Sequence, residues 1–119
     1  MSKCVLVVED EPLIRLLVID ILSEAGFEVF EAQDPAEALT VLKSDEHIDV
    51  LLTDVRMPGS MDGLKLAAAV RDRWPPVKII VTSGARTIEI TDMPDGSVFF
   101  SKPYAHLAVI QSMRELLSI

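Results

Sequence analysis

The sequence predicts an α/β fold, in which a doubly wound, five-stranded and mostly parallel sheet carries helices on both faces. Short apolar runs rich in β-branched residues alternate with segments that have the apolar spacing of helices. The runs are apolar throughout, as expected of strands that are buried on both faces. Polar residues follow directly after most of these runs, and chemistry in such folds collects at the carboxyl ends of strands. Right-handed crossovers between the strands would place helices on both sides of the sheet.

Five runs have the composition of strands: 5–8, 29–31, 50–53, 78–82 and 98–101. Acidic residues follow the first run (9–11) and the third (Asp54). Ser83 follows the fourth run and Lys102 the fifth. Carboxylates, a hydroxyl and a lysine at four strand ends are expected to form one site.

The first two helices have clear start signals. Pro12 occupies a first-turn position and Gly26 provides a stop. Asp34-Pro35 combines a capping residue with a first-turn proline and predicts the start of the second helix. Apolar residues recur at helical spacing after these starts: Ile14, Leu17, Val18, Ile21 and Leu22 in the first helix, and Ala38, Leu39 and Leu42 in the second.

Two more helices are expected, one between Asp62-Gly63 and Pro75-Pro76, and the last from about 104 to 117. The crossover between the fourth and fifth strands, 85–96, combines weak helix formers with a Met-Pro-Asp-Gly turn. A helix of only one or two turns has little stability of its own. We therefore expect a short or irregular fourth helix.

Composition narrows the possible functions. The chain has 119 residues, 50% of them hydrophobic, a net charge of −8 and a sequence pI of about 4.6. These values suit one compact domain over residues 1–119 with no effector domain. The acidic balance opposes direct binding to nucleic acid. Cys4 is the single cysteine, so an internal disulfide cannot form, and no apolar run has the form of a signal peptide or a membrane span. We expect a cytoplasmic protein without membrane insertion.

The acidic residues after the first and third strands meet only if those strands are neighbours. This condition is fulfilled by the strand order 2-1-3-4-5, whose switch point lies between strands one and three. Carboxylates that meet there repel each other by about 4 kcal/mol per pair at ~4 Å and an effective dielectric constant of 20. A hard divalent cation removes this cost, and Mg²⁺ suits oxygen ligands and phosphate.

The remaining polar residues extend this site toward phosphoryl chemistry. Lys102 supplies a positive charge, and Ser83 supplies a hydroxyl that could bond to a phosphoryl oxygen, with Gly84 leaving space beside it. A carboxylate beside a cation, a lysine and a hydroxyl is equipped to accept a phosphoryl group. Asp54 is the natural acceptor, because its strand lies in the centre of the predicted sheet.

With these motifs the chain resembles the receiver domain of bacterial two-component response regulators, in the stand-alone, chemotaxis-type (CheY-like) form with a flavodoxin-like fold. The motifs are Glu9-Asp10-Glu11-Pro12, Asp54-Val55-Arg56-Met57-Pro58, Met61-Asp62-Gly63, Thr82-Ser83-Gly84 and Lys102-Pro103. The resemblance covers the whole chain. It implies a signalling phosphoacceptor in a phosphorelay and not an enzyme in the usual sense, although the domain would promote its own phosphotransfer and slow dephosphorylation.

The resemblance also implies roles for single residues. Asp54 would accept a phosphoryl group from a histidine kinase or a histidine phosphotransfer protein. Asp10, Asp54 and the backbone carbonyl of Arg56 would bind Mg²⁺, with Glu9 acting through water. Ser83 would be the switch hydroxyl, Lys102 would pair with the phosphoryl group, and Phe99 would be the aromatic switch that reports activation. The downstream target would be another protein, which the sequence does not name.

Three departures from the common pattern of the family affect these roles. Gly59-Ser60 adds one residue after Met57-Pro58, and this insertion favours Ser83 over Thr82 as the switch hydroxyl. The fourth crossover is short, so the surface for targets is expected to differ. Phe99 replaces the common Tyr and has no hydroxyl with which to form a hydrogen bond.

Two other classes fit less well, and a third stays open. A haloacid-dehalogenase-type phosphatase needs a second carboxylate two residues after its aspartate, where this chain has Arg56. A flavodoxin-like cofactor carrier needs a phosphate loop after the first strand, where residues 9–11 would repel phosphate. A receiver-like interaction module that is never phosphorylated is opposed by the intact set of residues, but only an assay excludes it.

Overall fold

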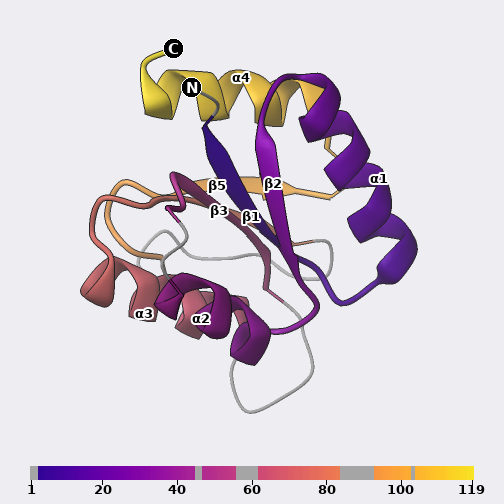
Figure 1. Ribbon diagram of the computed structural model, residues 1–119. Helices are drawn as coiled ribbons and strands as arrows, with labels where there is room; N and C mark the ends of the chain where they lie inside the picture. The colour runs from indigo at the N-terminus through magenta and orange to yellow at the C-terminus, as the bar shows by residue number, and fades with distance from the viewer. Residues whose placement is uncertain (1–2, 45–46, 56–61, 84–92, 103) are drawn as a thin grey trace.

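The computed structural model describes residues 3–44, 47–55, 62–83, 93–102 and 104–119. Its centre is a parallel sheet of five strands in the order β2-β1-β3-β4-β5, as predicted (Figure 1). The strands are β1 (Cys4–Val8), β2 (Glu28–Ala32), β3 (Val50–Asp54), β4 (Lys78–Ser83) and β5 (Val98–Ser101). The described helices are α1 (Pro12–Glu24), α2 (Pro35–Lys43), α3 (Gly63–Arg73) and α4 (His106–Leu117).

The helices form a layer on each side of the sheet, which separates two hydrophobic cores. Figure 1 shows α2 and α3 on one face, with α1 and α4 on the other. Side chains alternate between the faces along each strand. In β4, for example, Ile79 and Val81 belong to the core under α2 and α3, whereas Ile80 belongs to the core under α1 and α4. The central strands are therefore apolar on both faces, as the sequence predicted.

Side-chain caps fix the starts of α2 and α3 where the sequence placed them. A carboxylate oxygen of Asp34 accepts a hydrogen bond from the backbone N–H of Glu37 at 2.8 Å. Asp62 accepts one from the backbone N–H of Lys65 at 2.9 Å. The first turn of a helix has N–H groups without helical partners, and these two carboxylates satisfy one each.

The first helix differs from this pattern in its cap and in its burial. Pro12 is its first residue, but the side chain of Glu11 at the cap position makes no capping hydrogen bond. Of its apolar residues, only Val18 and Leu22 are buried. Four are exposed: Leu13 (76%), Ile14 (40%), Leu16 (58%) and Leu17 (51%). Helical apolar spacing therefore located this helix, but it did not show that the first two turns face solvent.

The fourth crossover lies mostly outside the described residues, which exclude 84–92. Its described part is a turn in which the backbone N–H of Ser97 donates to the carbonyl of Pro94 at 3.1 Å, with Gly96 at a positive φ of 81°. The expected short or irregular fourth helix thus stays a prediction. Within the described ranges, no helix has both the length and the apolar character needed to cross a lipid bilayer.

Gly63 is the point where α3 packs directly against the end of β3. A Cβ built on Gly63 would overlap the backbone carbonyl of Asp54 and lie 2.9 Å from the Cα of Val55. The backbone N–H of Gly63 also donates to the carbonyl of Val55 at 2.8 Å. The Asp-Gly pair of the sequence thus combines a helix cap with a residue small enough to lie against the strand that carries Asp54.

We expect Gly63→Ala to lower the free energy of unfolding by about 3 kcal/mol, because the added methyl group must push α3 away from the backbone of Asp54 and Val55. Gly26→Ala is the matched control. Gly26 has a positive φ of 99°, but a methyl group added there would meet no atom within 4 Å, so the cost should be about 1 kcal/mol of conformational strain. Urea unfolding measures both variants. Equal losses would contradict the close approach at Gly63.

Candidate functional site

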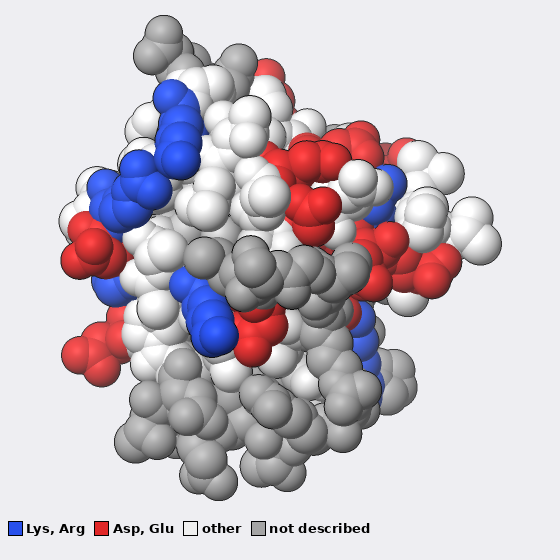
Figure 2. Space-filling view, turned by 90° about the horizontal axis from the view of Figure 1, so that it is seen from below, with Lys and Arg blue, Asp and Glu red and all other residues white. Residues whose placement is uncertain are grey.

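The carboxyl ends of β1, β3, β4 and β5 meet at one edge of the sheet. Asp54 is the last residue of β3, which pairs with β1 on one side and β4 on the other. Glu9 and Asp10 follow β1, and Lys102 follows β5. Figure 2 views the molecule from this edge and shows acidic side chains gathered from its centre toward the side on which Figure 1 places α1.

Lys102 joins two of the strand ends through its side chain. Its Nζ donates to Asp54 Oδ2 at 2.9 Å and to Glu9 Oε1 at 3.2 Å. These three side chains are largely withdrawn from water, with exposed fractions of 25% for Lys102, 12% for Asp54 and 8% for Glu9. The backbone N–H of Lys102 also donates to the carbonyl of Ser83 at 2.9 Å, which ties the lysine to the end of β4.

Glu9 is a buried carboxylate held from several directions. Its Oε2 accepts a hydrogen bond from the backbone N–H of Glu11 at 3.1 Å, while Oε1 accepts the bond from Lys102. Its own backbone N–H donates to the carbonyl of Ala32 in β2 at 3.1 Å. The carboxylate is therefore fixed in place and hydrogen-bonded, as a buried charge requires.

Glu9, Asp10 and Asp54 form an acidic cluster that could bind a metal ion. One carboxylate oxygen of each lies within 4.8 Å of the others. Glu9 is buried, Asp54 is half-buried and Asp10 is exposed, so the cluster opens to solvent on the Asp10 side. Oxygen donors of this kind suit a hard cation such as Mg²⁺. The backbone carbonyl predicted as a further ligand belongs to Arg56, which lies outside the described residues.

Ser83 ends β4 with a buried hydroxyl. The residue is 2% exposed, and its Oγ has no hydrogen-bond partner among the described residues. Thr82 is also buried, at 3%. Phe99 is partly buried and packs against the core under α2 and α3. A buried hydroxyl without a partner costs free energy, and a phosphoryl oxygen that reached it would remove that cost.

Burial and charge shift the pKa values of two site residues in the same direction. Burial raises the pKa of Glu9, and the negative charge of Asp54 adds to the increase, although Glu11 N–H and Lys102 oppose it. Burial acting alone would lower the pKa of Lys102, but the hydrogen bonds and charges of Asp54 and Glu9 outweigh it, so the net shift is upward. Lys102 therefore keeps its positive charge in the site.

The structure adds one residue that the motifs did not indicate. Arg15 of α1 donates from Nη1 to the backbone carbonyl of Glu9 at 2.8 Å and from Nε to Glu31 Oε1 at 3.0 Å. The signal in the sequence was a single basic residue within the apolar first turns of this helix. Spacing alone could not show whether Arg15 faced the site or the solvent.

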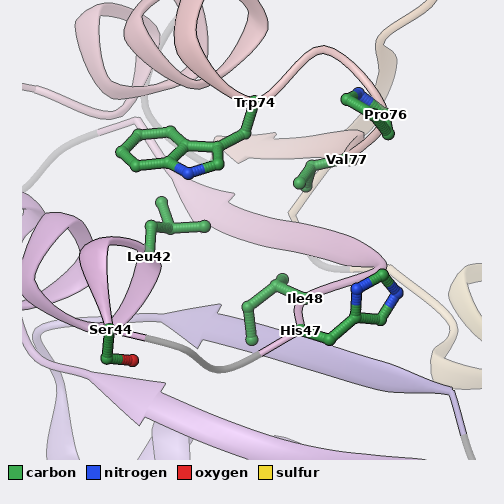
Figure 3. A pocket seen from close by; sticks show the side chains of 7 residues that line it. All are labelled: Leu42, Ser44, His47, Ile48, Trp74, Pro76 and Val77. Carbon is green, nitrogen blue, oxygen red and sulfur yellow. The ribbon is translucent and has the colours of Figure 1, made fainter.

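A separate hollow lies at the opposite end of the sheet. Figure 3 shows the indole of Trp74 facing Leu42, with Ile48 and His47 at the other side of the space. The cavity has a volume of about 270 Å³ and is lined by the end of α2, the segment before β3 and the segment between α3 and β4. It contains none of the residues predicted to act in phosphoryl transfer.

The raised pKa of Glu9 predicts a pH-dependent stability. Its protonated form is favoured in the folded state, so its contribution to stability is present below the ordinary value of 4.5 and is lost as pH rises through the raised pKa. With divalent metal ions removed by EDTA, the free energy of unfolding of the wild type should fall relative to that of Glu9→Gln as the pH rises from 4.5 through the raised pKa of Glu9. Urea unfolding at a series of pH values measures the difference, with the exposed Glu24→Gln as control. A difference that is independent of pH would refute the prediction.

Comparisons with known proteins agree with this arrangement. Residues 5–113 match the family described as "Response regulator receiver domain". The sensor histidine kinase RcsC of Escherichia coli K12 is 42% identical over 82 residues, which is 68% of this chain and 8% of that protein. The sensor kinase CckA of Brucella abortus is 32% identical over 120 residues, which is 98% of this chain and 13% of that protein. The chain therefore spans a small part of the length of these relatives.

Solved structures are similar over nearly the full length. A response regulator receiver protein from Sinorhizobium medicae is 29% identical with a TM-score of 0.92, covering 98% of this chain and 95% of that one. The receiver domain of the hybrid histidine kinase CckA is 31% identical with a TM-score of 0.81, and the match covers 97% of this chain and 99% of that one. The chain belongs to the response regulator receiver domain family of two-component signalling, whose members are phosphoacceptors rather than enzymes in the usual sense.

Proposed function

We propose that this protein accepts a phosphoryl group on Asp54 with Mg²⁺ bound, and that this modification switches its contacts with other proteins. The observation that carries the proposal is the contact of Lys102 with both Asp54 and Glu9, beside the acidic cluster and the Ser83 hydroxyl, which has no partner among the described residues. Transfer to a carboxylate requires positive groups beside the negatively charged phosphoryl oxygens. Lys102 would supply one, and Mg²⁺ held by the acidic cluster would supply another.

The transfer exchanges one bond to phosphorus for another. A carboxylate oxygen of Asp54 attacks the phosphorus of a phosphohistidine, the P–N bond breaks, and the imidazole leaves with the bonding electrons and takes up a proton. Lys102 stays charged and can bond to a phosphoryl oxygen. Asp10, Asp54 and the carbonyl of Arg56 would hold Mg²⁺, with Glu9 acting through water, and the ion would offset the negative charge of the phosphoryl group. Later attack by water on the acyl phosphate gives the slow dephosphorylation expected of the family.

Ser83 and Phe99 are proposed as the switch pair. Alternation along β4 places Ser83 on the same face as Val81, whose Cα is the register partner of Phe99 in β5. Thr82 falls on the opposite face with Phe100 as its register partner. Ser83 thus shares a face of the sheet with Phe99, whereas Thr82 is the register partner of Asp54. Ser83 is proposed as the hydroxyl that is drawn to the phosphoryl group because its buried Oγ has no hydrogen-bond partner among the described residues. Phosphorylation would then shift the population between two packings of one surface.

The proposed donor is a histidine kinase or a histidine phosphotransfer protein. The relatives RcsC and CckA are named as sensor kinases, which supports such a partner. The exposed Leu13, Ile14, Leu16 and Leu17, here called the α1 apolar surface, lie on the helix that directly follows Glu9 and Asp10. An apolar surface beside the acceptor suits a helical donor whose phosphohistidine must reach Asp54. We further propose that residues 1–119 act as one receiver unit whose output is protein contact, without nucleic acid or membrane insertion.

Intact-protein mass after incubation with acetyl phosphate and Mg²⁺ tests the acceptor. We expect the wild type to gain the mass of one phosphoryl group, with no gain in EDTA or in Asp54→Asn. Asp34→Asn is the matched control and should gain the same mass as the wild type. Failure of the folded wild type to gain mass or to bind beryllium fluoride would favour a receiver-like module that is never phosphorylated.

Polar substitutions on the α1 apolar surface should slow phosphoryl transfer from a protein donor but not from a small-molecule donor. We expect Leu13→Ser and Leu17→Ser each to weaken transfer from a phosphorylated histidine kinase domain by about tenfold, because loss of a buried contact costs about 1–2 kcal/mol. The rate with acetyl phosphate should not change, since a small donor needs no docking. Ile119→Ser, at an exposed apolar residue near the other end of the molecule, is the control. Equal losses with both donors would contradict the docking role.

A further inference from the structure

We propose that Arg15 is a positioning residue that orients the peptide between Glu9 and Asp10 and thereby sets the affinity of the acidic cluster for Mg²⁺. This inference rests on the proposed function, because it assumes that the cluster binds the ion. It assigns a role to a residue of α1 that lies outside the motifs at the strand ends.

The contacts of Arg15 connect three segments of the chain. Nη1 donates to the backbone carbonyl of Glu9 at 2.8 Å, and Nε donates to Glu31 Oε1 at the end of β2 at 3.0 Å. The side chain of Arg15 is 17% exposed, whereas that of Glu31 is 59% exposed. The guanidinium thus bridges the carboxyl ends of β1 and β2, with its planar fork directed at one carbonyl and one carboxylate.

The carbonyl that Arg15 binds belongs to the peptide unit that leads into Asp10. The carbonyl of Glu9 and the N–H of Asp10 lie in one plane because the peptide bond does not rotate. Holding this carbonyl therefore restricts ψ of Glu9 and φ of Asp10 together. Asp10 is exposed, so the direction of its carboxylate depends on this backbone restriction more than on surrounding side chains.

Among the described residues, the turn before α1 lacks a side-chain cap of the kind that starts α2 and α3. Asp34 and Asp62 cap those helices, but the side chain of Glu11 makes no capping bond at the start of α1. Residues 9–11 are held instead by the bonds that Glu9 makes with Ala32, Lys102 and Glu11 N–H, and by Arg15 at the carbonyl of Glu9. Loss of the Arg15 side chain would leave the central peptide of this turn with one fewer restraint.

A positioning role and a purely electrostatic role predict opposite signs. Arg15 is positively charged, so removing it would strengthen the binding of a cation if charge alone mattered. If Arg15 orients Asp10, its removal lowers the fraction of molecules with a complete ligand set, and the apparent dissociation constant rises by the inverse of that fraction. The direction of the change therefore identifies the role.

The test is calorimetric titration of Mg²⁺ into the wild type, Arg15→Ala and Arg15→Lys. We expect Arg15→Ala to bind Mg²⁺ about tenfold more weakly, as it would if the competent orientation fell to about one tenth of the population. Arg15→Lys keeps the charge but not the fork, and should recover only part of the loss. Arg114→Ala is the matched control, because Arg114 also braces a backbone carbonyl, that of Ala25 at 3.3 Å, away from the site.

A second measurement separates positioning from loss of structure. With acetyl phosphate as donor, Arg15→Ala should need about tenfold more Mg²⁺ for half-maximal phosphorylation while reaching nearly the wild-type maximal rate. Binding of Mg²⁺ by Arg15→Ala that is unchanged or tighter would overturn the inference alone. If Arg15→Ala does not fold, an unchanged affinity in Arg15→Lys would overturn it. Failure of the folded wild type itself to bind Mg²⁺ would overturn the proposed metal site and this inference together.

Discussion

The arrangement of the site depends on one lysine that is shared by two partly buried carboxylates. Lys102 contacts two residues that lie 93 and 48 positions before it in the chain, and it does so where three carboxylates converge. Without this ammonium group, the carboxylates of Glu9 and Asp54 would be withdrawn from water without the cation that pairs with both of them, which is costly. Three carboxylates and one ammonium still leave an excess of two negative charges. A divalent cation would balance that excess.

The same imbalance explains how a small chemical change could alter the protein. A phosphoryl group on Asp54 would add negative charge beside Lys102 and bring oxygen atoms toward Ser83, whose buried hydroxyl lacks a partner among the described residues. An unsatisfied buried hydroxyl costs about 1–3 kcal/mol. Recovering such an amount is enough to change the balance between two conformations that differ by a few kcal/mol. The strand that carries Ser83 pairs with β5, which carries Phe99, so the change could pass to that strand.

The first helix has two different faces, and both belong to the proposed function. Val18 and Leu22 attach it to the sheet, and Arg15 reaches back to the turn that carries Glu9 and Asp10. The leucine and isoleucine side chains of its first two turns point to solvent instead. Helical periodicity makes this division possible, because residues three or four apart share a face while those between them point elsewhere. One element can therefore brace the acidic cluster and present an apolar surface for the proposed donor.

Local signals in the sequence were enough to predict the strands and the residues at their carboxyl ends, and the need to bring those residues together predicted the strand order. Apolar runs located the strands, and Asp34 and Asp62 marked the starts of two helices, because these signals act within a few residues. The proximity of Glu9, Asp54 and Lys102 followed from the strand order that their chemistry required. Three other features emerged only from the folded chain: Gly63 touches the backbone of Asp54, Arg15 turns inward, and the α1 apolar surface turns outward. They depend on the packing of one element against another, which local spacing does not encode.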